Sequence, residues 1–400
     1  MTDPTPSAAL PAAEDAPAPD QARPRSRAWL DASGAARVHP VARRAFEQAL
    51  DDGWADPRRL STEGRRARAL LDAAREAVAA AVGARTEEVH VAPSHTAALH
   101  AAVLGTAAGR RRAGTRAVAS AVERAAVLHA AEHAGLELAR VPVARTGAVD
   151  EDAFATALDD GPAALAALQH ANGEVGTLQP TAAVHETTSR GGVPLLVDGG
   201  ASVGHVEIGP AWDLLALDPR DWGSVPGAGV LVVRRGVRWR PVTPEDEDRF
   251  FPGGPSVPAA FAAAASLEAV LTDRAEADRR RRALVDLVRA RVAAEVPDVE
   301  VVGDPDHRLP HVVTFSCLYV DGEALVTELD RAGFAVGSGS ACTSSSLEPS
   351  HVLAAMGVLT HGNVRLALDR EATADDVDRF LAVLPGAVAR VRAMLGAQAL

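Results

Sequence analysis

A single cysteine stands in the stretch of this sequence that is richest in small polar residues. The stretch from Gly337 to Gly357 reads GSGSACTSSSLEPSHVLAAMG and places Cys342 among serines and glycines. A thiol on such a loop is exposed and able to meet other molecules, so it is a candidate sulfur nucleophile, with a structural linker as the alternative interpretation. Cys317 lies instead in the apolar run HVVTFSCLYV, which predicts an inert thiol in a buried strand.

The second chemical feature is the complete lack of lysine. All 41 basic side chains counted as Lys and Arg in the 400 residues are arginine. A guanidinium stays protonated, so it cannot supply the uncharged amine that forms a Schiff base with an aldehyde cofactor such as pyridoxal phosphate. Compositional drift in an Ala-rich and Arg-rich chain explains why arginine replaces lysine. It would not explain an acidic residue at a position where a lysine is expected.

Composition and charge limit the remaining possibilities. A hydrophobic content of 47% in 400 residues predicts two or three domains with a substantial core. The formal net charge of -12 argues against general binding to nucleic acid or to an anionic membrane. No apolar run reaches the roughly 18 to 20 residues of a membrane span, and the N-terminus lacks a signal-peptide pattern. We therefore expect a soluble, cytoplasmic protein.

The elements that must position these residues follow from the apolar pattern. Residues 1–27 are rich in Pro, Ala and Asp without periodicity, which predicts a disordered tail. Farther along, short apolar runs alternate with amphipathic segments. The expected strands are residues 116–119, 137–141, 163–169, 194–198, 214–217 and 229–233, and the expected helices include residues 63–82, 96–107, 122–134 and 151–158. This alternation predicts an α/β fold with a mostly parallel sheet between helices, and functional groups at the carboxyl ends of its strands.

The last third of the chain has a different pattern. A helical stretch from about residue 258 to residue 296 precedes a smaller α+β set that ends in a helix over residues 374–395, with Thr373 and Asp376 as its capping pair. The expected organisation is a large α/β domain over residues 41–255. Residues 28–40 and 256–400 then form a small α+β domain that carries the Cys342 loop.

With these motifs in view, the stretch around Cys342 resembles the active-cysteine loop of the cysteine desulfurases. These are class V aminotransferases of the fold type I pyridoxal-phosphate architecture, and the similarity extends from Trp29 to about Leu384. The resemblance implies an aminotransferase-like large domain, pyridoxal phosphate as the family cofactor and a dimer. It also implies that Cys342 takes sulfur as a persulfide and passes it to an acceptor protein.

The resemblance further implies that five pocket positions are retained. Thr96 lies at the phosphate-binding loop, Asn172 lies near the ring oxygen of the cofactor, and Asp198 pairs with the pyridine nitrogen. Ser256 stands where the family has a threonine that reaches the neighbouring subunit's phosphate site. Arg365 would hold the substrate carboxylate.

Other pocket positions are altered by the same comparison. Asp221 occupies the place of the Schiff-base lysine, and Asp218 and Arg220 lie in the family's Ser-Gly-His-Lys run. Arg124 replaces the histidine that stacks on the cofactor ring, and Ala201 replaces a glutamine. These changes all face the ring and aldehyde of the cofactor.

The altered residues have a predictable electrostatic consequence. Three carboxylates, Asp198, Asp218 and Asp221, would share one buried place opposite Arg124 and Arg220. Buried carboxylates ionise together only when cations pair with them. We therefore predict an Arg-Asp network that fills the space of the cofactor ring.

Histidines offer two further hypotheses. His129 and His133 are four residues apart on an expected helix, but no cysteine or carboxylate stands at ligand spacing near them or near His95 and His100, so we expect no metal site. His95 and Thr96 begin another expected helix, whose free N–H groups favour an anion even without a pyridoxal ring.

Three functions remain open at this point. The first is an active cysteine desulfurase, which the missing lysine opposes. The second, which we favour, is a family member that has abandoned pyridoxal chemistry and carries sulfur on Cys342, taking it from a true desulfurase or another donor. The third is a non-catalytic scaffold, or one half of a heterodimer that lends Ser256 to an active partner's site.

Overall fold

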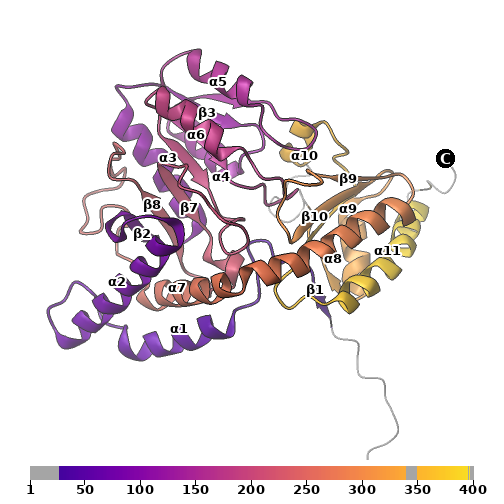
Figure 1. Ribbon diagram of the computed structural model, residues 1–400, viewed down its shortest axis with the longest axis horizontal. Helices are drawn as coiled ribbons and strands as arrows, with labels where there is room; N and C mark the ends of the chain where they lie inside the picture. The colour runs from indigo at the N-terminus through magenta and orange to yellow at the C-terminus, as the bar shows by residue number, and fades with distance from the viewer. Residues whose placement is uncertain (1–26, 339–348, 395, 397–400) are drawn as a thin grey trace, which may run out of the picture.

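The computed structural model describes residues 27–338, residues 349–394 and residue 396 (Figure 1). The predicted disordered tail, apart from its last residue, lies outside the described residues, and so does Cys342. None of the helices in the described ranges combines the length and apolar character that crossing a membrane requires.

A seven-stranded sheet forms the centre of the larger part of the molecule. Its strand order is β2-β8-β7-β6-β5-β3-β4, and all neighbours are parallel except β8, which is antiparallel to both of its neighbours. The strands are β2 (Val89–Ala92), β3 (Arg116–Ser120), β4 (Glu137–Val141), β5 (Ala163–Gln169), β6 (Leu195–Asp198), β7 (Leu214–Leu217) and β8 (Gly229–Val233). The predicted mostly parallel α/β sheet is confirmed; β2 was not predicted.

Helices cover both faces of this sheet. On one face, α3 (His95–Arg110) and α4 (Ala125–His133) pack on alternate strand residues such as Leu165 and Leu214. On the other face, α2 (Thr62–Val82), α5 (Glu151–Asp159), α6 (Thr181–Arg190) and α7 (Val257–Thr272) pack on the intervening residues such as Leu168 and Leu215. The helix α1 (Pro40–Asp52) lies against α7, and η1 (Thr86–Glu88) precedes β2 (Figure 1). Two covered faces explain why the central strands β5, β7 and β8 are almost entirely apolar.

The predicted start of α4 at residue 122 was wrong. Val122 and Glu123 form a turn held by Ser120, since the Ser120 carbonyl oxygen accepts from Glu123 N at 3.1 Å. The helix therefore begins at Ala125, with Arg124 as its N-cap residue in a non-helical conformation. This turn carries the side chains of Glu123 and Arg124 to the carboxyl end of the sheet.

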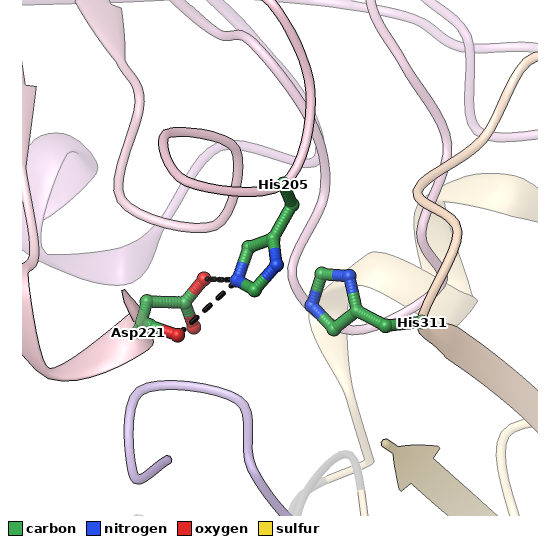
Figure 2. A group of neighbouring side chains, drawn as sticks. All are labelled: His205, Asp221 and His311. Carbon is green, nitrogen blue, oxygen red and sulfur yellow. Dashed lines mark hydrogen bonds and ion pairs between the residues drawn. The ribbon is translucent and has the colours of Figure 1, made fainter. Parts of the chain in front are cut away.

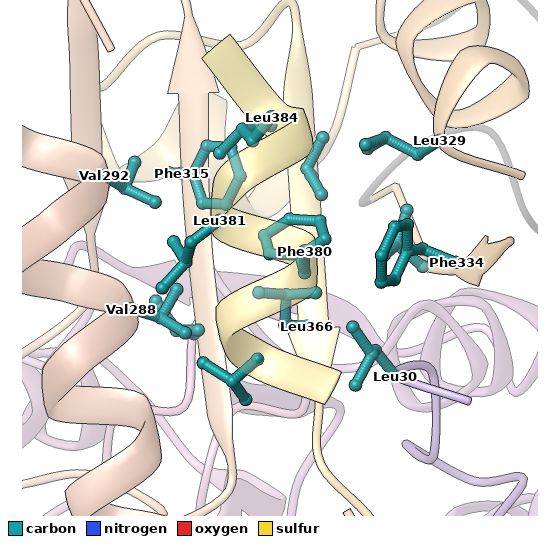
Figure 3. Packing of buried hydrophobic residues seen from close by; sticks show 14 of the residues in the cluster. Leu30, Val288, Val292, Phe315, Leu329, Phe334, Leu366, Phe380, Leu381 and Leu384 are labelled. Carbon is teal, nitrogen blue, oxygen red and sulfur yellow. The ribbon is translucent and has the colours of Figure 1, made fainter. Parts of the chain in front are cut away.

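The smaller part is built on a three-stranded antiparallel sheet of order β12-β10-β9. Its elements are β9 (Val299–Val302), β10 (Val312–Cys317), β12 (Asn363–Ala367), α8 (Arg274–Glu295), α9 (Gly322–Arg331), α10 (His351–Met356) and α11 (Ala374–Met394). The short strands β1 (Ala28–Trp29) and β11 (Phe334–Ala335) pair in parallel beside it. Figure 3 shows its core, where Phe315 of β10 and Phe380 of α11 lie among aliphatic side chains of α8 and β12.

Two expectations about helix ends have different outcomes. The single helical stretch predicted over residues 258–296 is two helices, because Asp273, with φ of -117°, separates α7 from α8. The capping pair of α11 is confirmed. Thr373 N donates to Asp376 Oδ2 and Asp376 N donates to Thr373 Oγ1, both at 3.1 Å, which satisfies free N–H groups at the helix start.

Candidate functional site

Several of the predicted site residues gather where parallel strands end. Asp198 is the last residue of β6, Asn172 follows β5, and Asp218 follows β7 directly. Arg124 comes from the turn after β3. The carboxyl ends of neighbouring parallel strands meet at one edge of the sheet, so residues far apart in sequence converge there, as expected for this fold class.

Asp198 is the centre of one group of contacts. Its side chain is buried; Oδ1 lies 2.9 Å from His95 Nε2 and Oδ2 lies 2.8 Å from Arg124 Nε. Burial by itself raises the pKa of Asp198, but His95 and Arg124 outweigh burial and hold this pKa below its usual range. Asp198 in turn raises the pKa of Arg124. Both carboxylate oxygens therefore have nitrogen partners within the chain.

Glu123, beside Arg124, was not predicted as a site residue. Its side chain is fully buried, and Oε1 accepts a hydrogen bond from Gln169 N while Oε2 has no hydrogen-bond partner among the described residues. Burial, with the nearby charge of Asp198, raises the pKa of Glu123 to about 8. The group therefore holds a proton at neutral pH. Nothing in the surrounding run AVERAAV marks it as buried, because its environment comes from β5 and β6.

Asp218 and Arg220 form a second, local pair. Asp218 caps the short helix η2 (Pro219–Trp222) by accepting from Arg220 N at 3.1 Å. The Arg220 guanidinium also lies 3.1 Å from Asp218 Oδ2, and its side chain is half-exposed. The backbone turn and the ion pair hold the same two residues together.

Asp221, at the other end of η2, has a different partner from the one predicted. Its Oδ2 lies 2.9 Å from His205 Nε2, and its Oδ1 accepts from Gly34 N at 2.8 Å. The His205 ring stacks on His311, with centroids 3.9 Å apart and planes at 30° (Figure 2). The predicted Arg-Asp network exists as two pairs, Arg124–Asp198 and Arg220–Asp218. It was wrong for Asp221, because η2 directs this carboxylate toward the turn after β6, where His205 lies.

Three retained positions take structural roles here. Asn172 Oδ1 accepts from Glu174 N and Val175 N, both at 2.9 Å, so it closes the turn after β5. Ser256 caps α7. Arg365 lies on β12 in the smaller part, where its guanidinium binds Asp31 Oδ1 at 2.7 Å.

Two further positions flank the Asp198 group. Thr96 is exposed in the first turn of α3, next to buried His95. Ala201 is buried in a small apolar cluster, and a Cβ on Gly173 would lie 3.4 Å from the Ala201 Cβ and 4.0 Å from an Arg124 nitrogen. A side chain at Gly173 would therefore contact both Ala201 and the Arg124 guanidinium.

The Cys317 prediction is confirmed. This thiol is fully buried in β10, and burial raises its pKa to about 12. At neutral pH it therefore carries almost no thiolate.

Comparisons with known proteins show which family the chain belongs to. Residues 28–380 match the family described as Aminotransferase class-V. A cysteine desulfurase of Cereibacter sphaeroides is 33% identical over 380 residues, 92% of this chain and 97% of that protein. Cysteine desulfurase IscS 1 of Archaeoglobus fulgidus is 35% identical over 268 residues, 65% of this chain and 69% of that protein.

Solved structures share the fold. A protein described as NifS-like superposes with a TM-score of 0.82 at 21% identity, covering 92% of this chain and 99% of that one. DndA from Streptomyces lividans superposes with a TM-score of 0.72 at 27% identity, covering 84% of this chain and 98% of that one. From the family match, the relatives and the shared architecture together, we conclude that the chain belongs to the class V aminotransferase family, among the cysteine desulfurases.

Proposed function

We propose that this chain is a sulfur-transfer protein of the cysteine desulfurase family that works without a Schiff base to pyridoxal phosphate, carrying sulfur as a persulfide on Cys342. The observation that carries the proposal is that Asp221, in the place of the family's lysine, is buried and paired with His205 in a chain that has no lysine. A carboxylate cannot form an imine with an aldehyde.

The residues around Asp198 also do not fit the cofactor ring. Family members use this aspartate to pair with the pyridine nitrogen, but here His95 and Arg124 occupy its two oxygens. Arg124 extends from the position of the ring-stacking histidine to reach Asp198. A pyridine nitrogen would have to compete with a guanidinium for the same carboxylate, which a charged hydrogen bond disfavours.

The substrate end of the pocket supports the same proposal. Arg365, which would hold the carboxylate of cysteine, already binds the carboxylate of Asp31 at 2.7 Å. Asp31 thus stands in for a substrate carboxylate. Free cysteine would have to displace it at a cost in affinity.

Only one of the two thiols suits sulfur transfer. The buried Cys317, with its pKa of about 12, is not a nucleophile at neutral pH. Cys342 lies outside the described residues, and its role rests on the sequence of its loop.

The proposed transfer is a thiol–persulfide exchange. The Cys342 thiolate attacks the outer sulfur of a donor persulfide, a new S–S bond forms at Cys342, and the donor's S–S bond breaks to release its thiolate. An acceptor thiolate then attacks the outer sulfur on Cys342 in the same way and regenerates the Cys342 thiolate. Each step conserves atoms and electrons and needs no external oxidant.

The proposal includes a cellular setting. We place the protein in the cytoplasm, as a dimer with itself or with an active desulfurase, facing a sulfur-acceptor protein. A dimer is supported by the family, in which active sites lie at the subunit interface.

Intact mass of the purified chain tests the proposal. The chain and a Cys342→Ser control are incubated with cysteine and pyridoxal phosphate, and then with an active desulfurase added. A gain of one sulfur atom only with the desulfurase, absent in the control, supports a carrier. A gain with cysteine and pyridoxal phosphate alone shows an active desulfurase, and no gain in either incubation leaves a scaffold.

A further inference from the structure

A cavity of about 270 Å³ lies beside Asp221, between the two parts of the molecule. Its wall is formed by the segment leading into α1, by η2, by α8 and by the loop after β12. Three of its buried polar side chains are His205, Asp221 and His311, which are 4%, 3% and 2% exposed. Buried polar side chains that line an internal space form a candidate ligand-binding site.

The three side chains come from separate elements and meet at one point (Figure 2). His205 lies in the turn after β6, Asp221 lies in η2, and His311 directly precedes β10. One ligand atom from each, two imidazole nitrogens and one carboxylate oxygen, lie within 4.8 Å of one another. Ligand atoms on a tetrahedral ion with bonds of about 2.0–2.1 Å are about 3.3–3.4 Å apart, so metal binding requires the three atoms to move closer and one of the two stacked rings to turn until its in-plane lone pair points at the ion.

A metal ion would bind here by replacing the contact between Asp221 Oδ2 and His205 Nε2. Asp221 Oδ1 is held by Gly34 N–H, which orients the carboxylate and leaves Oδ2 facing His205. The Nδ1 atoms of His205 and His311 have no hydrogen-bond partner among the described residues, although both rings are buried. An unpartnered buried nitrogen costs free energy that a bound ion would recover.

We propose that His205, Asp221 and His311 bind one divalent transition-metal ion, in a site with two imidazoles and one carboxylate that leaves coordination positions open toward the cavity. Imidazole with one carboxylate suits Zn²⁺, Fe²⁺ and Co²⁺ better than Mg²⁺ or Ca²⁺, which prefer oxygen ligands alone. Three protein ligands with open positions are typical of a reactive metal site rather than a structural one.

Arg281 of α8 indicates what the open positions would hold. Its side chain is fully buried in the wall of the same cavity; within the part of the chain that the structure describes, Nε and Nη1 have no hydrogen-bond partner, while Nη2 binds Asp278. Free guanidinium donors near a cation favour an anionic ligand that reaches both. The site therefore suits a metal ion with a small anion, such as a carboxylate or inorganic phosphate, between the ion and Arg281.

The sequence alone did not predict this site. The sequence pattern marks Asp221 as the replacement of a lysine, whereas the histidines that it offers for metal binding are His95, His100, His129 and His133. The proposal is independent of sulfur transfer, because none of its ligands belongs to the Cys342 loop.

Direct metal binding is the test. The full chain, purified without a histidine tag and stripped with a chelator, is titrated with Zn²⁺ by calorimetry and with Co²⁺ by visible absorption. We expect one ion per chain, with a Co²⁺ spectrum of low coordination number. Asp221→Asn and His311→Asn should each weaken binding at least about 100-fold, since loss of a ligand costs more than the loss of an outer partner. Inorganic phosphate should tighten Co²⁺ binding in the wild type and not in Arg281→Met.

Matched variants separate this site from others. His129→Asn combined with His133→Asn removes the exposed i, i+4 pair, and Cys342→Ser removes the loop thiol; both proteins should bind as the wild type does. Absence of stoichiometric Zn²⁺ and Co²⁺ binding by the wild type overturns the proposal, and so does unchanged binding in the Asp221→Asn and His311→Asn variants. If these variants fail to fold, X-ray absorption of the Zn²⁺-loaded wild type decides between imidazole ligands and water or thiolate.

Discussion

Asp221 and His205 lie in buried contact, with Oδ2 and Nε2 2.9 Å apart, at the position that sequence resemblance aligns with the Schiff-base lysine of the cysteine desulfurases. The carboxylate is further held by Gly34 N–H, so it joins η2 to the segment that precedes α1. The aspartate at position 221 therefore contributes to the packing of the molecule through these two contacts. Asp221 has acquired partners of its own, and removing it has a structural cost.

Replacement of Asp221 should lower the free energy of unfolding. Asp221→Ala leaves Gly34 N–H without its buried acceptor, which costs about 1–3 kcal/mol, and removes the carboxylate beside His205 Nε2, although this nitrogen keeps its contact with the Asp221 carbonyl oxygen at 3.2 Å. Asp221→Asn keeps an acceptor for Gly34 and should cost less. Denaturant unfolding of the metal-stripped proteins measures both, and equal stability of wild type and Asp221→Ala would contradict the importance of this pair.

Glu123 should make stability depend on pH. Its pKa of about 8 lies above the ordinary value of 4.5, so its contribution to stability is fully present below about pH 4.5 and is lost as pH rises through about 8. The contribution is on the order of 5 kcal/mol. Glu123→Gln cannot titrate, so its unfolding free energy should fall less than that of the wild type between pH 5 and pH 8, in denaturant unfolding at a series of pH values. Parallel curves for the two proteins would rule out a protonated Glu123.

Native alkylation should distinguish the two thiols. Because Cys317 is buried with a raised pKa, iodoacetamide should leave the folded Cys342→Ser protein unmodified. The same protein should take up one label in denaturant. Mass spectrometry reads both results, and labelling of folded Cys342→Ser would show that the Cys317 strand opens.

Asp31 should control access to Arg365. Asp31→Ala removes the carboxylate that binds the guanidinium at 2.7 Å, so Arg365 becomes free to bind a small carboxylate such as cysteine. We expect tighter cysteine binding in Asp31→Ala than in the wild type, by about 10-fold or more, since a charge-assisted hydrogen bond contributes about 1.5–3 kcal/mol. Calorimetric titration measures the affinity. The double variant Asp31→Ala/Arg365→Ala should lose the gain, and retention of the gain would place the cysteine elsewhere.

The local pattern of apolar residues correctly predicted several strands of the large sheet. The runs at residues 137–141, 163–169, 214–217 and 229–233 are strands with the predicted bounds, because short apolar runs between turn residues suit a sheet covered on both faces. The turn before α4 and the break at Asp273 were missed, because each depends on a few backbone hydrogen bonds that leave the apolar period unchanged.

The sequence by itself determined the fold class, the missing lysine and the buried position of Cys317, because these depend on residue type and local period. Only the tertiary structure decided which charges pair. Asp31 meets Arg365 across 334 positions, and Asp221 meets His205 and not an arginine. Such pairs depend on how strand ends and loops converge in space, since electrostatic partners are selected by distance and burial and leave no periodic signal in the chain.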